Sequence, residues 1–233
     1  MNVDAVDEHT LTRLDNVLQT LREMLADRHY KVDSIAWPSA EDVYYWSDFE
    51  KLTFALPSLL AENRWIMVFF PNEAKIGVSS VREMVSEMTD AAVDDAIFVV
   101  RIGLTSAANT ELLKATASRT EQPRADASVV GRKRGRSTQP SSSRARKNVE
   151  IFTYDELQTN ITLHEWVPTH TVLSKAEKAI ISKRYGVRDA QFPGISVKDP
   201  VARYYGLKRG QLVFIERLSE SAGSAIFYRI VRG

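Results

Sequence analysis

Residues 199 to 210 combine aromatic and charged side chains that could bind another macromolecule. Within this stretch two adjacent tyrosines, Tyr204 and Tyr205, stand close to two adjacent cations, Lys208 and Arg209. Aromatic rings stack on bases and cations bind phosphates, so the segment could bind nucleic acid. Tyrosine and arginine are also the side chains that protein interfaces favour. The residue types alone leave both uses open.

Glu73 and Lys75 are the residues that could support catalysis. They follow directly after a buried apolar run at 65–70. A Glu-x-Lys in that place looks like the metal-dependent nuclease fold, in which acidic side chains hold Mg²⁺ and a lysine steadies the attacking water. Such a site needs a second acidic residue, for which Asp94 and Asp95 are the nearby candidates. The alternative is that Glu73 and Lys75 belong to a turn that leaves a strand.

Other catalytic and metal-binding chemistry has little support. The chain has no cysteine, which excludes disulfides, thiol catalysis and thiolate metal sites. His164 and His170 lie close in sequence, but no carboxylate stands at metal-ligand spacing around them, and a satisfied boundary or core histidine is the simpler interpretation. No Gly-rich phosphate loop and no Gly-x-Ser-x-Gly motif is present. We therefore expect no metal, no cofactor and no small-molecule substrate.

Length and charge bound the class of protein. The 233 residues allow one large or two modest domains. With 31 basic and 30 acidic residues the net charge is +1, so any attraction to nucleic acid must come from local patches. Asp4, Asp7 and Glu8 stand where a signal peptide would need positive charge, and no apolar stretch approaches the ~20 residues of a membrane helix. We expect a soluble intracellular protein without membrane contact.

The elements of the first half predict an α/β domain. Continuous apolar runs at 65–70 and 96–100 are typical of strands that are buried on both faces. Ser80 with Glu83 is a capping-box pattern that predicts a helix from Ser80 through Met88, between the two strands, and Thr105 can cap a third helix. Alternating strands and helices indicate an α/β layer.

Two helices are predicted before the first of these strands. Apolar residues at three- and four-residue spacing predict a helix over 10–30 with one buried face. Ser47 with Glu50 is another capping-box pattern and predicts a helix over 52–55, which Pro57 would end.

The composition changes between residues 118 and 148. Arginine and lysine stand there among serine, proline, glycine and glutamine with almost nothing apolar to bury, so we expect a disordered insertion. It could be a solvated loop, or a nuclear-import or nucleic-acid-binding segment, as Gly-Arg-Lys-Arg-Gly-Arg at 131–136 would favour. The apolar pattern at 149–153 then predicts a strand that adds to the first domain.

The remaining residues predict a small α+β domain that ends in a hairpin. Ser174 with Glu177 is a capping box for a helix that Gly186 can end. Asp199 can cap a second, short helix, with Pro200 at its first position and Gly206 closing it. Extended runs at 211–217 and 225–231 then form the hairpin. The predicted domains are 1–160, with the insertion at 118–148, and 161–233.

The chain closely resembles a known family over nearly its whole length. The residues 199–210 and those that follow them resemble the C-terminal domain of the fifth-largest subunit shared by the eukaryotic nuclear RNA polymerases, and a small archaeal RNA polymerase subunit is similar to this domain alone. The first half looks like the eukaryote-specific jaw domain of the same eukaryotic subunit. In the C-terminal part the matching residues outside 199–210 are Asn160, Ile161, Thr162, His164, Glu165, Val167, Pro168, His170, Gln211, Val213, Ser219, Glu220, Ala222, Gly223, Tyr228, Arg229 and Val231. In the jaw part they are Val68, Phe69, Phe70, Pro71, Lys75, Gly77, Val99, Val100, Gly103, Leu104 and Thr105.

The resemblance implies a non-catalytic subunit of a multi-subunit, nuclear DNA-directed RNA polymerase that acts in transcription. Its C-terminal domain would dock on the largest subunit, near a small shared subunit. Its N-terminal domain would form part of the lower jaw, close to downstream double-stranded DNA. The residues carried over as partner-binding are Asp199, Pro200, Arg203, Tyr204, Tyr205, Leu207, Lys208 and Arg209. Those carried over as DNA-facing are Thr105, Ser106, Ala107 and Ala108.

This chain departs from the family pattern at two places. The family shows Thr-Pro-Ser-Ala where this chain has Thr-Ser-Ala-Ala at 105–108, and the loss of proline makes that loop less rigid. The basic insertion at 118–148 has no equivalent in the usual pattern. It could supplement DNA binding through salt-dependent attraction, or mark a specialised form used by only one polymerase. A Mg²⁺-dependent nuclease and a free basic DNA-binding protein are the rival interpretations.

Overall fold

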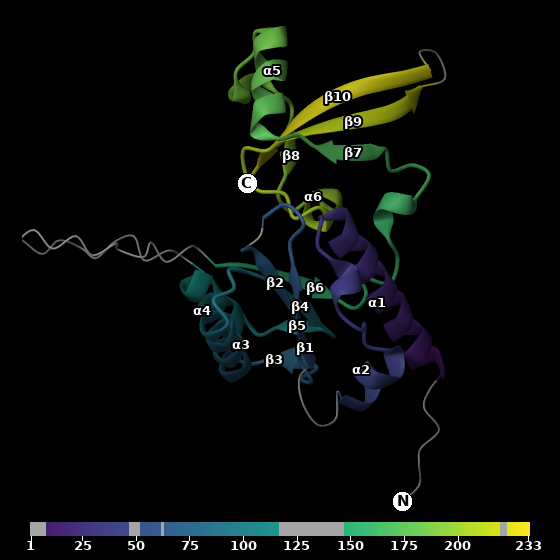
Figure 1. The fold of residues 1–233 in the computed structure, drawn as a ribbon, viewed down its shortest axis with the longest axis vertical. Helices are drawn as coiled ribbons and strands as arrows, with labels where there is room; N and C mark the ends of the chain where they lie inside the picture. Colours follow the sequence, from purple (N-terminus) through teal and green to yellow (C-terminus); the bar gives the residue numbers. More distant parts are fainter. Residues whose placement is uncertain (1–7, 47–51, 62, 117–146, 220–222) are drawn as a thin grey trace, which may run out of the picture. The chain divides into compact units, whose positions relative to one another are not determined.

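The computed structural model describes residues 8–46, 52–61, 63–116, 147–219 and 223–233 (Figure 1). The chain forms two compact units. One, the central unit, runs from Asp33 to Glu156. The other, the discontinuous unit, combines the segment up to Val32 with Leu157–Gly233. The sequence predicted one division near residue 160, whereas the structure groups the first helix with the end of the chain. The boundaries of the functional domains remain a prediction.

A mixed four-stranded sheet forms the centre of the central unit, in the order β1-β2-β4-β6. The strands are β1 (Leu52–Pro57), β2 (Trp65–Phe70), β4 (Asp95–Val100) and β6 (Asn148–Thr153). The edge strand β1 is antiparallel to β2, whereas β2, β4 and β6 are parallel. All six residues of β4 are buried, which explains its uninterrupted apolar sequence.

Helices α3 (Val78–Asp90) and α4 (Ser106–Thr116) cover one face of this sheet. Their buried side chains Val81, Met84 and Leu112 pack in one cluster with Phe69 and Phe98 of the strands. A small parallel pair, β3 (Lys75–Ile76) and β5 (Gly103–Leu104), joins the loops that lead into the two helices. The short elements η1 (Val32–Ser34) and α2 (Ala40–Trp46) precede the sheet. The predicted α/β layer with β6 as its last strand is confirmed.

Two local predictions in the central unit were wrong. Residues 52–57 form the strand β1 rather than a helix, because they pair with β2. The ring of Phe54 in β1 stacks on that of Phe70 in β2, with 6.2 Å between the ring centroids. Pro57 is tolerated because β1 is an edge strand. Helix α3 begins at Val78, two residues before Ser80, so the Ser80–Glu83 pair does not open it. The predicted cap at Ser47 and Glu50 lies outside the described residues. So do residues 118–146 of the insertion that was predicted to be disordered over 118–148, whereas Asn148 was wrongly included because it begins β6.

The discontinuous unit contains a second mixed sheet, ordered β7-β9-β10-β8. Its strands are β7 (Thr169–Val172), β8 (Gly194–Ser196), β9 (Leu212–Ser219) and β10 (Gly223–Arg232). Strands β9 and β10 form the predicted antiparallel hairpin, and β8 is parallel to β10. The other elements are α1 (Glu8–Asp27), η2 (Ile161–Leu163), α5 (Lys175–Tyr185), η3 (Asp189–Gln191) and α6 (Pro200–Tyr204).

Each face of the second sheet packs against its own short helix. On one face, Val213 and Ile215 pack with Ala202 and Leu207 of the α6 segment. On the other, Leu212 and Ile230 pack with residues that include Ile181 of α5. Both caps predicted for α5 are present: Ser174 and Glu177 exchange hydrogen bonds as a capping box, and Gly186 closes the helix at a φ of 63°. In the part of the chain that the structure describes, no helix is long and apolar enough to cross a membrane.

Candidate partner-docking surface

Helix α6 and the turn that follows it form as the local sequence dictates. The Asp199 carboxylate accepts a hydrogen bond from the Val201 N–H at 3.0 Å, and Pro200 occupies the first turn, where its missing N–H costs nothing. Gly206 adopts a φ of 60°, and the Leu207 N–H reaches back to the Ala202 carbonyl at 2.9 Å. This is a Schellman closure, which requires a residue in the left-handed region. The predicted cap, first turn and closure of α6 are therefore confirmed.

Tyr204 lies inside the discontinuous unit, with only 4% of its surface exposed. Its hydroxyl donates a hydrogen bond to Asp27 at 2.8 Å and accepts one from the Asn160 side chain at 3.1 Å. The same Asn160 amide donates to Glu23 at 2.8 Å. Burial, followed by the hydrogen bond to Asp27, raises the pKa of Tyr204 well above its ordinary value. Tyr204 therefore anchors α6 to α1 and to the segment before η2.

Arg28 binds the C-terminal end of α6. Its Nε donates to the Tyr204 carbonyl at 2.7 Å and its Nη2 to the Arg203 carbonyl at 2.6 Å. The last carbonyls of a helix carry partial negative charge, so a guanidinium is favourable there. At the Arg203 carbonyl it adds to the hydrogen bond from the Gly206 N–H at 2.9 Å. No motif marks Arg28 in the sequence, because it lies 175 and 176 residues from its two acceptors.

The remaining predicted partner-binding residues divide into buried and exposed ones. Leu207 is buried in the core, whereas Tyr205 is half-buried with its ring edge-on to Tyr204 at 5.1 Å between centroids. Lys208 and Arg209 are exposed on the turn beyond α6, as is Pro200 at its start. The structure thus brings the predicted residues together in one short segment, of which only part faces solvent. Whether this segment binds a partner stays a prediction.

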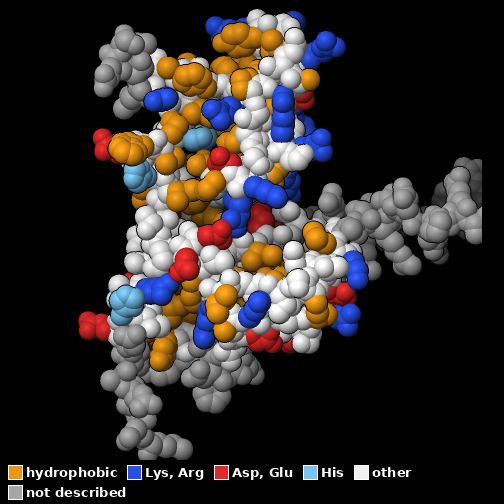
Figure 2. Space-filling model, turned by 180° about the vertical axis from the view of Figure 1, so that it is seen from behind, with side chains coloured by type: hydrophobic (Ala, Val, Ile, Leu, Met, Phe, Trp, Pro, Cys, Tyr) orange, Lys and Arg blue, Asp and Glu red, His pale blue; other side chains and the backbone are white. Residues whose placement is uncertain are grey.

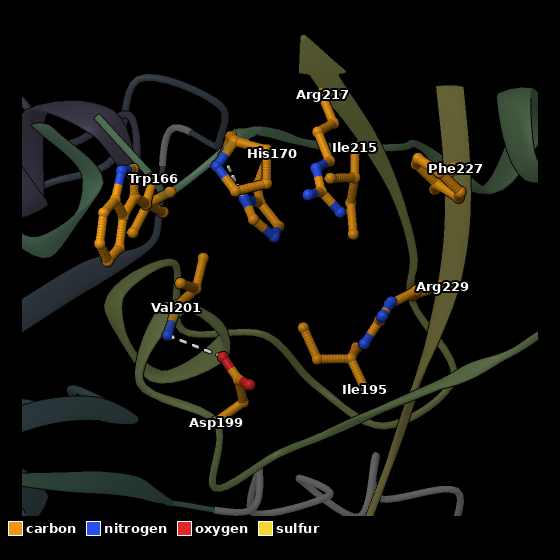
Figure 3. A pocket seen from close by; sticks show the side chains of 11 residues that line it. Trp166, His170, Ile195, Asp199, Val201, Ile215, Arg217, Phe227 and Arg229 are labelled. Carbon is orange, nitrogen blue, oxygen red and sulfur yellow. Dashed lines mark hydrogen bonds between the residues drawn. The ribbon is translucent and has the colours of Figure 1, made fainter. Parts of the chain in front are cut away.

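A pocket of about 340 Å³ opens next to α6 in the discontinuous unit (Figure 3). Trp166, His170 and Phe227 line it together with Arg217 and Arg229. In Figure 2, hydrophobic side chains gather around a histidine on the upper part of the molecule, with cations among them. Sequence reasoning did not single out this pocket, because its lining comes from four strands, α6 with its cap, and the segment before β7.

The two histidines that lie close in sequence, His164 and His170, each have a hydrogen-bond partner in the backbone. The Nδ1 of His170 lies 2.6 Å from the Pro168 carbonyl oxygen and donates to it. The Nδ1 of His164 accepts a hydrogen bond from the Trp166 backbone N–H at 3.2 Å. Within the described residues, no three histidine, aspartate or glutamate side chains are grouped so that they could hold a metal ion.

The predicted DNA-facing residues form the start of α4 in the central unit. Thr105 caps this helix as predicted, because its hydroxyl accepts a hydrogen bond from the Ala108 N–H at 3.2 Å. Ser106 and Ala107 are exposed, whereas Ala108 is fully buried against the core. Only the first turn of the helix and the two exposed side chains are therefore accessible to a ligand.

Glu73 and Lys75 are arranged as a turn that leads into α3. The Glu73 carboxylate accepts hydrogen bonds from the Ser80 hydroxyl at 2.6 Å and from the Gly77 N–H at 2.9 Å, and both lower its pKa. It acts as a cap for the start of α3. Asp95, one of the two candidates for the second acidic residue, is buried and bound to Arg64 at 2.7 Å. The carboxylates of Glu73 and Asp95 are thus each engaged in a separate structural contact.

Comparisons with known proteins cover both halves of the chain. Residues 8–88 match the family described as "RNA polymerase Rpb5, N-terminal domain", and residues 159–231 match "RNA polymerase Rpb5, C-terminal domain". "DNA-directed RNA polymerases I, II, and III subunit RPABC1" of Caenorhabditis elegans is 34% identical over 237 residues, covering 97% of this chain and 99% of that protein. The subunit of the same name from Dictyostelium discoideum is 33% identical, covering 94% and 98%. The chain therefore belongs to the Rpb5 family, the family of a non-catalytic subunit of DNA-directed RNA polymerases.

Proposed function

We propose that this chain is built into a nuclear RNA polymerase through its C-terminal segment, which docks on the largest subunit near a small shared subunit. The observation that carries this proposal is the way α6 is held. Its C-terminal carbonyls are bound by Arg28, and Tyr204 is fixed by Asp27 and Asn160. A short helix with so many buried contacts presents the exposed turn at Lys208 and Arg209 in one conformation, which lowers the entropy cost of binding.

The docking proposal is tested by affinity purification of the tagged full-length chain from its own cells. Charge reversal at both Lys208→Glu and Arg209→Glu should reduce recovery of the largest subunit, because both side chains are exposed and their change leaves the core intact. The matched control is Lys183→Glu, which reverses an exposed cation on α5, across the sheet from α6. Unchanged recovery with the double variant would contradict the proposal.

We further propose that the chain is shared by three nuclear polymerases, as the names of its relatives state for those proteins. The same purification then recovers three different largest subunits, and the tagged chain is found in the nucleus. The alternative is a specialised form that serves one polymerase, in which case a single largest subunit accompanies it. Membership of a non-catalytic family leaves no role for the nuclease alternative built on Glu73 and Lys75.

The central unit is proposed to form part of the lower jaw and to contact downstream duplex DNA through the start of α4. The exposed first turn of this helix offers backbone N–H groups and a positive dipole end to a phosphate. A photo-crosslinker at position 106 in a transcribing complex should form an adduct with downstream DNA. The same crosslinker at Leu113, exposed toward the other end of α4, is the matched control. Equal yields, or no adduct from position 106, would count against the contact.

A further inference from the structure

Helix α5 contacts the second sheet with one side and leaves its other side open to solvent (Figure 1). No residue of this helix is buried, although Ile181 packs against the sheet. Its neighbour Ile180 is 65% exposed. Residues three and four apart lie on one face of a helix, so Ile180 shares a face with residues one turn before it and one turn after it. This outer face of α5 consists of the exposed residues Ala176, Ala179, Ile180, Lys183 and Arg184.

The segment around α5 carries an excess of positive charge. Residues 174–191 contain five cations and two carboxylates. Both carboxylates are already used: Glu177 accepts the capping hydrogen bond from the Ser174 N–H at 2.7 Å, and Asp189 pairs with Lys178 at 2.6 Å. Within the described residues, the cations of this segment that have no carboxylate partner are Lys175, Lys183, Arg184 and Arg188. An acidic ligand can therefore bind here without displacing an existing ion pair.

Two of these cations stand directly beside Ile180. Lys183 and Arg184 follow it by three and four residues, the spacing at which the side chains of a helix are neighbours. The Arg184 guanidinium lies over the Tyr185 ring, 5.9 Å from its centroid, and that ring contacts Tyr228 of β10 at 5.8 Å between centroids. The sheet thus helps to position the charge of Arg184, so less conformational entropy is lost when a ligand binds it.

We propose that the outer face of α5 binds an acidic amphipathic helix of a partner protein. Ile180 packs into the apolar stripe of that helix, and the small side chains of Ala176 and Ala179 let the two helices approach to about 8–10 Å between their axes. Acidic side chains beside the stripe pair with Lys183 and Arg184. The 11 residues of α5 span about 16 Å, so the contact extends over about three turns of the partner helix. A contact of this size forms a transient complex.

The apolar centre of this face favours a protein helix over nucleic acid. A phosphate backbone would pair with the cations but leave Ile180 in water, whereas an apolar stripe gains hydrophobic free energy by covering it. Stacked bases need a free aromatic platform, but Arg184 already lies over the Tyr185 ring. Helices α5 and α6 pack on opposite faces of the sheet, so this proposal does not rest on the docking of the C-terminal segment proposed above.

The test uses the purified full-length chain and a fluorescein-labelled, blocked peptide made of two repeats of Leu-Glu-Ala-Leu-Glu-Glu-Ala. Its leucines line one face of a helix and its glutamates flank them. Fluorescence anisotropy should show saturable binding that weakens as salt is added, because exposed ion pairs are screened. Ile180→Gln, which keeps a good helix former, should weaken the binding about tenfold by removing the apolar contact. Lys183→Glu together with Arg184→Glu should weaken it about tenfold or more, since attraction becomes repulsion.

Matched substitutions elsewhere on the chain should leave this affinity unchanged. Leu113→Gln removes an aliphatic side chain of similar exposure, 62%, from α4. Lys208→Glu together with Arg209→Glu makes the same change of charge on the exposed turn beyond α6. A peptide with lysine in place of every glutamate should bind the double variant at Lys183 and Arg184 better than it binds the native chain. This gain of binding also shows that the double variant is folded.

Several outcomes would overturn the proposal. One is the absence of saturable binding to the native chain, and another is equal binding of a peptide with glutamine in place of every glutamate. Equal binding of a scrambled peptide of the same composition would leave no role for the apolar stripe. Tighter binding of a ten-base-pair DNA duplex than of the acidic peptide would assign the cations to phosphate.

Recovery of the largest subunit by the α5 variants is measured in parallel by affinity purification of the tagged chain. It should be unchanged, and its loss would assign this face to the largest subunit rather than to a separate partner. A failure of the docking at α6 is seen instead in the double variant at Lys208 and Arg209, so the two proposals fail independently.

Discussion

Replacing Tyr204 by phenylalanine isolates the contribution of one buried hydroxyl to the anchoring of α6. The substitution keeps the ring, which is 4% exposed, and removes the hydrogen bonds to Asp27 and from Asn160. A typical intramolecular hydrogen bond contributes about 1 kcal/mol net, and one to a charged acceptor about 1.5–3 kcal/mol. Asp27 is exposed and regains water when the hydroxyl is lost, and Asn160 keeps its bond to Glu23. We therefore expect a loss of about 2 kcal/mol at neutral pH.

The pH dependence of that loss has a definite sign. The pKa of Tyr204 is raised above its ordinary value of 10.0 in the folded protein, chiefly by burial and then by Asp27. Below pH 10 both the folded and the unfolded tyrosine are protonated, so its full stabilisation is present. As the pH rises above 10 the unfolded tyrosine ionises first, and stability falls by up to about 1.4 kcal/mol per pH unit. The stability advantage of the native chain over Tyr204→Phe should therefore shrink in alkali.

Hydrogen exchange of the full-length chain, measured by mass spectrometry in increasing urea, is the suitable assay. It reports α6 and β9 separately from the central unit, whereas a single unfolding curve of a two-unit protein would mix the two transitions. Asp27→Asn and the double variant complete a double-mutant cycle, in which a coupling of about 1 kcal/mol is expected. A change below about 0.5 kcal/mol for Tyr204→Phe, or an advantage of the native chain that grows above pH 10, would refute the reasoning.

Three further substitutions test other contacts by the same exchange measurement. Arg28→Ala should destabilise α6 by about 1–3 kcal/mol, because two helix-end carbonyls lose their charged donor. Arg28→Lys should recover only part of this stability, since an ammonium cannot bond both carbonyls in the same geometry. Equal stability of the native chain and the two variants would contradict the role of Arg28 at the end of α6. Gly206→Ala should cost about 1–2 kcal/mol because its φ is 60°, whereas Gly77→Ala, at a φ of −86° with ordinary contacts, should be nearly neutral. Phe98→Ala should destabilise the central unit by about 3–5 kcal/mol, since its fully buried ring packs edge-on to Phe69 at 5.3 Å; a loss below about 1 kcal/mol would mean that the core collapses to fill the cavity.

Local signals in the sequence were sufficient wherever a neighbour along the chain supplied the deciding contact. The capping box at Ser174, the cap at Asp199 and the left-handed glycines Gly186 and Gly206 were all predicted and are all present. Each depends on hydrogen bonds between residues that are two to five positions apart, which fixed spacing makes visible. The buried strand β4 was visible for another reason, since a strand covered on both faces must be apolar throughout.

The prediction failed where a distant partner overrode a local pattern. Residues 52–57 contain nothing that forbids a helix before Pro57, and only the pairing with β2 makes them a strand. Ser80 and Glu83 have the spacing of a capping box, yet α3 begins earlier because the Glu73 carboxylate caps it from the preceding turn. Local propensity is a weak prior, and tertiary contacts decide between alternatives of similar energy.

The sequence by itself determined that residues 199–210 form a capped short helix followed by a basic turn, and its likeness to a known family indicated the kind of assembly it serves. Only the tertiary structure decided which of those residues face inward. Tyr204 is used to anchor the helix and Arg28 to bind its end, whereas Lys208 and Arg209 remain exposed. The physical reason is that burial and hydrogen bonding depend on residues more than 170 positions away, which no local spacing records.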